Sequence, residues 1–187
     1  MMRARRLVAL LPLVLTACGY NTIQSYDERA NAAKQQIEVQ LQRRADLVPN
    51  LVQVVRAQAK QELDVFTQVA RARSGLVDAV QKGDPGQMAE ANEQLTTAMK
   101  GLMIQVEAYP QLKSDQAFLR LQDELTGTEN RIAVARTDLN GTVETYNTYI
   151  RRFPQVMTAK VIGAKPKAYF EVTNAAAREA PKVDFSK

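Results

Sequence analysis

Few side chains of this chain can do chemistry on their own. The 187 residues include one cysteine, Cys18, and no histidine. Without histidine the chain cannot build a Ser-His-Asp or Cys-His nucleophile, a histidine-containing zinc site, or the Glu-x-x-His di-iron site of helical bundles. The sequence also has no glycine-rich phosphate loop. We therefore predict a non-catalytic protein with no metal and no cofactor, and a carboxylate-based enzyme is the remote alternative.

Cys18 closes a segment that has the features of a lipoprotein signal peptide. Three arginines and no acid precede the apolar run Leu7–Leu15, and Leu15-Thr16-Ala17-Cys18 follows. This Leu-small-Ala-Cys pattern resembles a bacterial lipobox, whose cysteine becomes the first mature residue and carries a diacylglyceryl group. A plain secreted protein is the alternative, but its signal peptide would need a small residue where Leu15 stands. The apolar run is too short to span a bilayer, which needs about 20 residues.

A lipobox predicts where the protein is located. Residues 1–17 would be removed, residues 18–21 would form the lipidated anchor, and the lipid on Cys18 would be the only non-protein group. Several acyl chains anchor a protein stably, whereas a single chain is reversible. Gly19 stands where lipoproteins of the inner membrane commonly have Asp. We therefore expect the cell envelope, with the protein on the outer membrane and facing the periplasm of a two-membrane bacterium.

Removal of the signal peptide also changes the charge. Three of the 25 basic residues precede Cys18, so 22 basic residues remain against 20 acidic ones and the net charge falls from +5 to +2. No basic block with interleaved aromatic residues is left, which argues against a nucleic-acid partner. The 170 residues that remain of 187 suffice for one domain with a proper core.

Hydrophobic periodicity predicts an all-α domain over residues 22–172. Apolar residues spaced by threes and fours indicate four helices, at about 22–44, 46–81, 85–109 and 115–152. Asp46 and Pro49 are expected to start the second helix, and Gly83-Asp84-Pro85 to separate the second from the third. Short turns favour an antiparallel up-and-down bundle, and an extended coiled-coil oligomer is the alternative.

The pattern changes after Pro154. We expect a short helix over residues 156–162 at one end of the bundle, and then an extended strap over residues 165–172 that packs its aromatic side chains. Residues 173–187 are small and charged, and are predicted to be a mobile tail.

Charged residues interrupt the apolar stripes of two predicted helices. They are Glu62 and Arg73 on the second helix and Glu129 and Arg136 on the fourth. Our hypothesis is that the two acids pair with the two arginines across helices, in a polar network that fixes register more than it adds stability. Two alternatives stay open: half-exposed positions at the stripe edges, from which long side chains reach solvent, or a carboxylate site for protons or a metal.

Several motifs resemble the signatures of the LemA family of bacterial envelope proteins. One is QIEVQLQRRADLVPNL at residues 36–51, and another combines EAYPQLK at 107–113, LQDEL at 121–125 and TENRIAVAR at 128–136. The likeness covers about residues 20–172. It implies a helical bundle outside the cytoplasm and implies no defined reaction.

Location and fold together predict a function class. We expect a lipid-anchored helical scaffold or adaptor that contacts the membrane through its lipid and binds another envelope protein. The alternative is a structural protein that self-associates as a homo-oligomer on the membrane surface.

Overall fold

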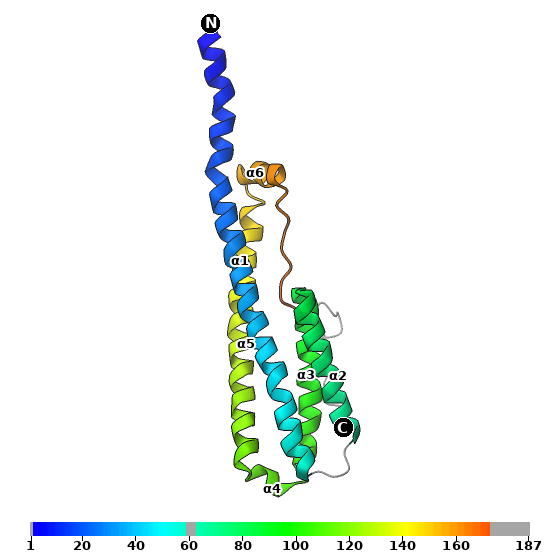
Figure 1. The fold of residues 1–187 in the computed structure, drawn as a ribbon. Helices are drawn as coiled ribbons and strands as arrows, with labels where there is room; N and C mark the ends of the chain where they lie inside the picture. Colours follow the sequence, from blue (N-terminus) through cyan, green and yellow to red (C-terminus); the bar gives the residue numbers. More distant parts are fainter. Residues whose placement is uncertain (1, 59–62, 173–187) are drawn as a thin grey trace, which may run out of the picture.

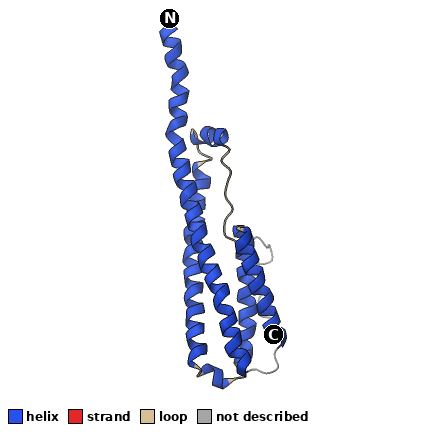
Figure 2. Ribbon diagram, in the orientation of Figure 1, coloured by secondary structure: helices blue, strands red, loops and turns tan. Residues whose placement is uncertain are grey.

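The computed structural model describes the backbone of residues 2–58 and 63–172 and the side chains of residues 19–58 and 64–172. Within these ranges the chain is helical and contains no strand (Figures 1 and 2). The helices are α1 (Met2–Gln58), α2 (Leu63–Lys82), α3 (Pro85–Val106), α4 (Pro110–Lys113), α5 (Gln116–Tyr149) and α6 (Gln155–Ile162). The predicted all-α class is confirmed.

The four long helices form an up-and-down bundle. Helices α1 and α5 lie antiparallel along a long contact, and α2 and α3 form a shorter hairpin beside one half of that pair (Figure 1). The short helix α4 makes the turn from α3 to α5 at one end. Helix α6 crosses the opposite end, and the strap returns from it toward the tip of the α2–α3 hairpin. This arrangement confirms the predicted antiparallel bundle.

The predicted start of a second helix at Asp46 is wrong. Helix α1 passes through Pro49 without a break and continues to Gln58. A proline inside a helix costs about 3 kcal/mol, because it removes one hydrogen bond and crowds the preceding turn. Here the apolar stripe continues in register across the proline, from Leu41 through Val48 to Val55, and all three side chains are fully buried. Burying that stripe outweighs the cost of the proline.

Local signals fixed the starts of α3 and α5 as predicted, whereas α3 ends at Val106 rather than near residue 109 and α5 at Tyr149 rather than near residue 152. Gly83 adopts φ +69° after α2, and the Asp84 side chain accepts a hydrogen bond from the backbone N–H of Gln87 at 2.8 Å. Pro85 then occupies the first turn of α3, where its missing N–H has no partner to lose. Asp115 caps α5 in the same way, accepting from Ala117 at 2.8 Å and Phe118 at 3.1 Å.

The core runs along the axis of the bundle. All four long helices contribute fully buried side chains, and Leu112 of α4 adds another at the closed end. The largest are Ile37, Leu41, Leu51, Leu76, Met88, Leu95, Leu102 and Leu139. A smaller cluster of Ile23, Tyr146, Ile150 and Ala159 lies at the α6 end. Among the described helices, none has an apolar stretch long enough to cross a membrane.

Two asparagines of α5 hold the strap in place. The backbone N–H of Lys167 donates to Asn147 Oδ1 at 2.8 Å, and Asn147 Nδ2 donates to the Lys167 carbonyl at 2.9 Å. Asn140 makes the same pair of bonds with Phe170, at 2.8 and 3.2 Å. Each side chain therefore acts as an amide partner for an extended backbone that lacks a neighbouring strand. Of the strap's two adjacent aromatic residues, Phe170 is buried in the core and Tyr169 stays exposed.

We expect Asn147→Ala to loosen the strap and to destabilise the protein by about 1 to 2 kcal/mol. The change removes two hydrogen bonds, each with a net contribution of about 1 kcal/mol. Urea unfolding measures the loss, and amide hydrogen exchange at Lys167 should accelerate. Asn50→Ala, at an exposed position of α1, is the matched control and should change little. Equal effects of the two substitutions would contradict this role for Asn147.

Candidate functional site: a groove between α3 and α5

A groove runs between α3 and α5, with α1 beneath it. Its upper part has a volume of about 620 Å³ and ends at the strap, where Phe170 and Val172 close it. Its lower part, of about 490 Å³, shares Thr96, Lys100 and Glu129 with the upper part and is mainly apolar. Hydrophobic side chains line this lower part: Met99, Met103, Ile104 and Leu125. The groove thus has a charged end near the strap and an apolar end toward α4.

Arg44 of α1 forms the charged floor of the upper part. Only 2% of Arg44 is exposed, and its guanidinium donates to Asn92 Oδ1 of α3 at 2.5 Å and to the Glu129 carboxylate of α5. Burial lowers the pKa of Arg44, while the charge and hydrogen bond of Glu129 oppose that shift. Within the described residues, Arg44 Nε is buried without a hydrogen-bond partner. One buried cation therefore links three helices.

Of the four charged residues singled out from the sequence, the three that the structure describes do not pair with one another. Glu129 takes its ion pair from Arg44, and among the described ion pairs it has none with Arg73 or Arg136. The Glu129 side chain is 49% exposed, so it reaches the buried Arg44 from the edge of its stripe. Arg136 is exposed on the rim of the upper groove. Glu62 lies outside the described residues, so its predicted pairing stays a prediction.

Arg73 of α2 has a different partner. Its Nε donates to the backbone carbonyl of Ala45 at 2.8 Å. In a regular helix that carbonyl would accept from the residue four positions later, which is Pro49 and has no N–H. Ala45 is fully buried, so its carbonyl would otherwise lack a partner there. Arg73 thus compensates for the proline and joins α2 to α1 at the point where we expected the chain to turn.

Arg44 and Asn92 were missed as partners in the sequence. The predicted helix end near residue 44 puts Arg44 at a turn, although Arg44 stands three residues after Leu41 and four before Val48, which places it on the apolar stripe. That spacing was the available signal for a buried arginine. Nothing in the spacing indicated which acid would meet it, because Glu129 is 85 residues away in the chain.

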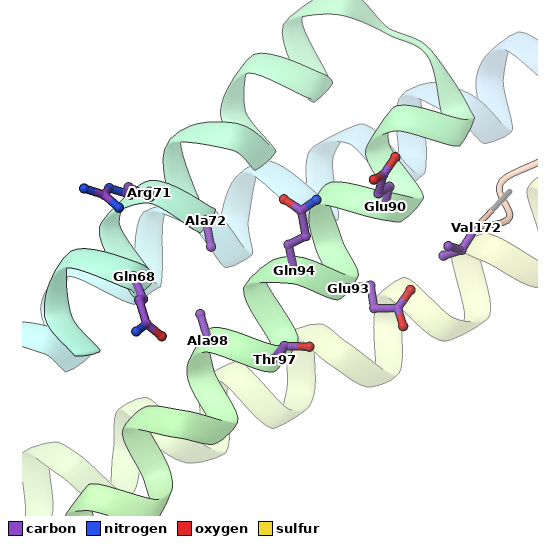
Figure 3. Close-up of a pocket in the computed structure, with 9 residues that line it drawn as sticks. All are labelled: Gln68, Arg71, Ala72, Glu90, Glu93, Gln94, Thr97, Ala98 and Val172. Carbon is purple, nitrogen blue, oxygen red and sulfur yellow. The ribbon is translucent and has the colours of Figure 1, made fainter. Parts of the chain in front are cut away.

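A second hollow lies on the other side of α3, between α2 and α3. Figure 3 shows Gln68 and Ala72 of α2 directed toward residues of α3, with Arg71 at the outer edge and Val172 at one end. Polar side chains surround two alanines, Ala72 and Ala98, and none of the charged ones is buried. The described residues also hold no group of three or more acidic, cysteine or histidine side chains placed to bind a metal. We therefore take the α3–α5 groove, with its buried charge, as the candidate site.

Tyr146 is a second buried titratable group, near the α6 end. Burial raises its pKa above the ordinary value of 10.0, and the charge and hydrogen bond of the Asp27 carboxylate raise it further. Lys167 binds the same carboxylate at 3.0 Å and lies 5.4 Å from the centre of the Tyr146 ring. This cluster fixes the strap to α1 and α5.

The raised pKa of Tyr146 predicts a loss of stability in alkali. Above about pH 10 a tyrosine in the unfolded chain loses its proton while Tyr146 in the folded chain keeps it, so the free energy of unfolding falls until the folded pKa is reached. Tyr146→Phe should therefore make the fall between about pH 9 and 11 less steep. Urea unfolding at several pH values measures the slope, and Tyr169→Phe, on an exposed ring, is the control. Equal slopes for all three proteins would contradict the assignment.

Comparisons with known proteins show which family and which relatives this chain resembles. The model of the family described as "LemA family" matches residues 33–185. The magnetosome protein MamQ 2 of Paramagnetospirillum magneticum (strain ATCC 700264 / AMB-1) is 29% identical over 178 residues, which cover 81% of this chain and 64% of the relative. The magnetosome protein MamQ of Magnetospirillum gryphiswaldense (strain DSM 6361 / JCM 21280 / NBRC 15271 / MSR-1) is 28% identical over 190 residues, covering 88% and 68%. The chain thus spans about two thirds of the length of these curated relatives.

Proposed function

This chain belongs to the LemA family, and from that premise we propose that it is a lipid-anchored, non-catalytic scaffold of the cell envelope. In this proposal the lipid on Cys18 holds the bundle on the outer membrane, and the α3–α5 groove binds a segment of another envelope protein. The relatives carry the name of a cellular structure, the magnetosome, and no reaction. Those names support a role in assembly over one in catalysis.

The groove is the observation that carries the proposal. An amphipathic partner helix could lay its apolar face along the lower part, where Met99 and Met103 offer flexible side chains that adapt to a partner. Lys100 and Arg136 border the upper part from opposite sides. Charges at that end would set the direction and register of the bound segment, because exposed charges contribute more to specificity than to affinity.

The continuous α1 helix supports the scaffold role. From residue 18 to residue 58 it spans about 60 Å, since an α-helix rises 1.5 Å per residue. A bundle anchored at Cys18 would therefore hold the apolar end of its groove well away from the membrane surface. A partner in the periplasm could reach the groove there without touching the bilayer.

Site-specific photocrosslinking in intact cells tests the proposal. A photoreactive amino acid replaces Met103 in the groove, and in a control it replaces Val134, an exposed residue of α5 outside the groove. Each is made with Cys18 and with Cys18→Ala, and crosslinked proteins are identified by mass spectrometry. We expect a defined envelope protein to crosslink from position 103, to be absent from position 134, and to be lost without Cys18.

Two other outcomes would count against this function. Crosslinks only between copies of this chain would refute the adaptor and support self-association on the membrane surface. Equal yields of the same protein from positions 103 and 134 would show that the groove is not its binding site.

A further inference from the structure

Helix α6 presents an apolar face that no described residue covers. Met157 and Val161 lie one turn apart on α6 and are 56% and 81% exposed, and Phe153, in the turn just before α6, is 84% exposed. The opposite side of the helix, with Thr158 and Ala159, is buried against α1. We call these three exposed side chains the α6 face. Three large exposed apolar side chains close together in the chain form a contact surface rather than scattered exposure.

The segment around the α6 face is strongly basic. From residue 150 to 170 the sequence has five basic residues and no acidic one. Arg151, Arg152, Lys160 and Lys165 are exposed, and none of them belongs to the ion pairs found in the described part of the chain. The fifth, Lys167, is bound to Asp27. Four free cations beside apolar side chains complement a surface that is both anionic and apolar.

The position of α6 indicates which anionic and apolar surface the α6 face meets. Gly19, the residue after Cys18, lies against α6: a Cβ atom there would be in van der Waals contact with Gln155 Cγ at 3.5 Å and Thr158 Oγ1 at 3.7 Å. Helix α6 therefore lies beside the residue predicted to carry the lipid, at the end of the bundle opposite α4, and it runs across the long helices (Figure 1). Tyr20, an amphipathic side chain of the kind enriched at membrane interfaces, is exposed at the same level.

We propose that the α6 face is a second membrane contact, which inserts into the interface of an anionic phospholipid bilayer beside the lipid on Cys18. The proposal rests on the lipid-anchored function given above and specifies how the bundle meets the membrane. Phe153, Met157 and Val161 enter the boundary between head groups and acyl chains, while the four cations bind lipid phosphates. Two attachment points at one end hold the bundle at a fixed angle to the membrane, whereas the lipid alone would let the bundle tilt.

Tryptophan fluorescence tests the contact, because the chain contains no tryptophan of its own. Val161→Trp puts a single reporter on the α6 face, and Ile104→Trp puts one at a position of α3 that is 71% exposed and near the α4 end. The acylated proteins are purified from membranes and reconstituted into vesicles of phosphatidylcholine and phosphatidylglycerol, with and without bromine on the acyl chains. The mass of the N-terminal peptide establishes whether Cys18 is acylated.

We expect the emission of Val161→Trp to shift to shorter wavelength and to be quenched by brominated lipid, and the emission of Ile104→Trp to show neither change. Quenching at position 161 should weaken when phosphatidylglycerol is left out, or when Arg151, Arg152 and Lys160 are all replaced by glutamine. Phe153→Trp, an aromatic-for-aromatic change, serves as a second reporter if Val161→Trp does not fold.

The outcomes separate the two proposals. Acylated, vesicle-bound protein without quenching at positions 161 and 153 would overturn the α6 contact and leave the lipid anchor intact. Protein without an acyl group at Cys18 would overturn the anchor, and quenching by anionic vesicles would then still support α6. Equal quenching at positions 161 and 104 would also overturn the proposal, since it would mean that the bundle has no fixed orientation.

Discussion

Glu129→Ala is expected to destabilise the bundle by about 2 to 3 kcal/mol. The substitution leaves the guanidinium of Arg44, which is 2% exposed, without its charged partner. Breaking a buried ion pair typically costs about 3 to 5 kcal/mol. The effect should be smaller here, because Glu129 is half-exposed and water can reach the pair through the groove.

Thermal and urea unfolding measure this loss. For a domain of this size, it corresponds to a fall in the melting temperature of about 5 to 10 °C. Arg136→Ala, two turns further along α5 and exposed, is the control and should shift the free energy of unfolding by no more than about 0.5 kcal/mol. Arg44→Met should cost less than Glu129→Ala, because it removes the buried charge itself.

A double mutant separates charge from packing. In the Arg44→Met background, Glu129→Ala should have little further effect, since no buried cation is left to satisfy. Additive losses in the double mutant would mean that the two side chains do not interact, and would contradict the buried pair.

Arg73→Met is expected to cost about 2 kcal/mol, and the loss should depend on Pro49. The substitution removes the donor that satisfies the Ala45 carbonyl, and an unsatisfied buried carbonyl costs about 1 to 3 kcal/mol. In the Pro49→Ala background, residue 49 has an N–H that can donate to the same carbonyl, so Arg73→Met should cost less than about 1 kcal/mol there.

Urea unfolding of the wild type, both single mutants and the double mutant measures this coupling. Arg71→Met, at an exposed position of the same helix, controls for the general loss of an arginine. An Arg73→Met effect that is the same with Pro49 and with Ala at position 49 would show that the carbonyl is not the reason for Arg73.

The contacts Arg44–Glu129 and Arg73–Ala45 show how much can be predicted from a charged residue in an apolar stripe. The stripe marked Glu129 and Arg73 as charged residues on an apolar face, and pairing across helices was one of three interpretations. Each meets α1, but through a different group: Glu129 binds a side chain, and Arg73 binds a backbone carbonyl freed by a proline. Choosing the partner requires knowing which helix faces meet, and the pattern of a single helix does not contain that information.

The sequence alone determined the features that depend on neighbouring residues. The helical class, the break at Gly83-Asp84-Pro85 and the start of a helix near residue 115 follow from propensity and from hydrogen bonds within a few residues. The predicted lipid attachment at Cys18 depends on local sequence in the same way.

Only the tertiary structure decided the continuity of α1 past Pro49, the pairing of Arg44 with Glu129, and the groove between α3 and α5. Each depends on residues far apart in the chain, such as Arg73 and Ala45, which are 28 positions apart. A proline in a helix interior is unfavourable by about 3 kcal/mol, so local preference alone would end the helix before Pro49. Packing of the buried stripe and one hydrogen bond from another helix together exceeded that preference, and such contacts exist only once the helices have assembled.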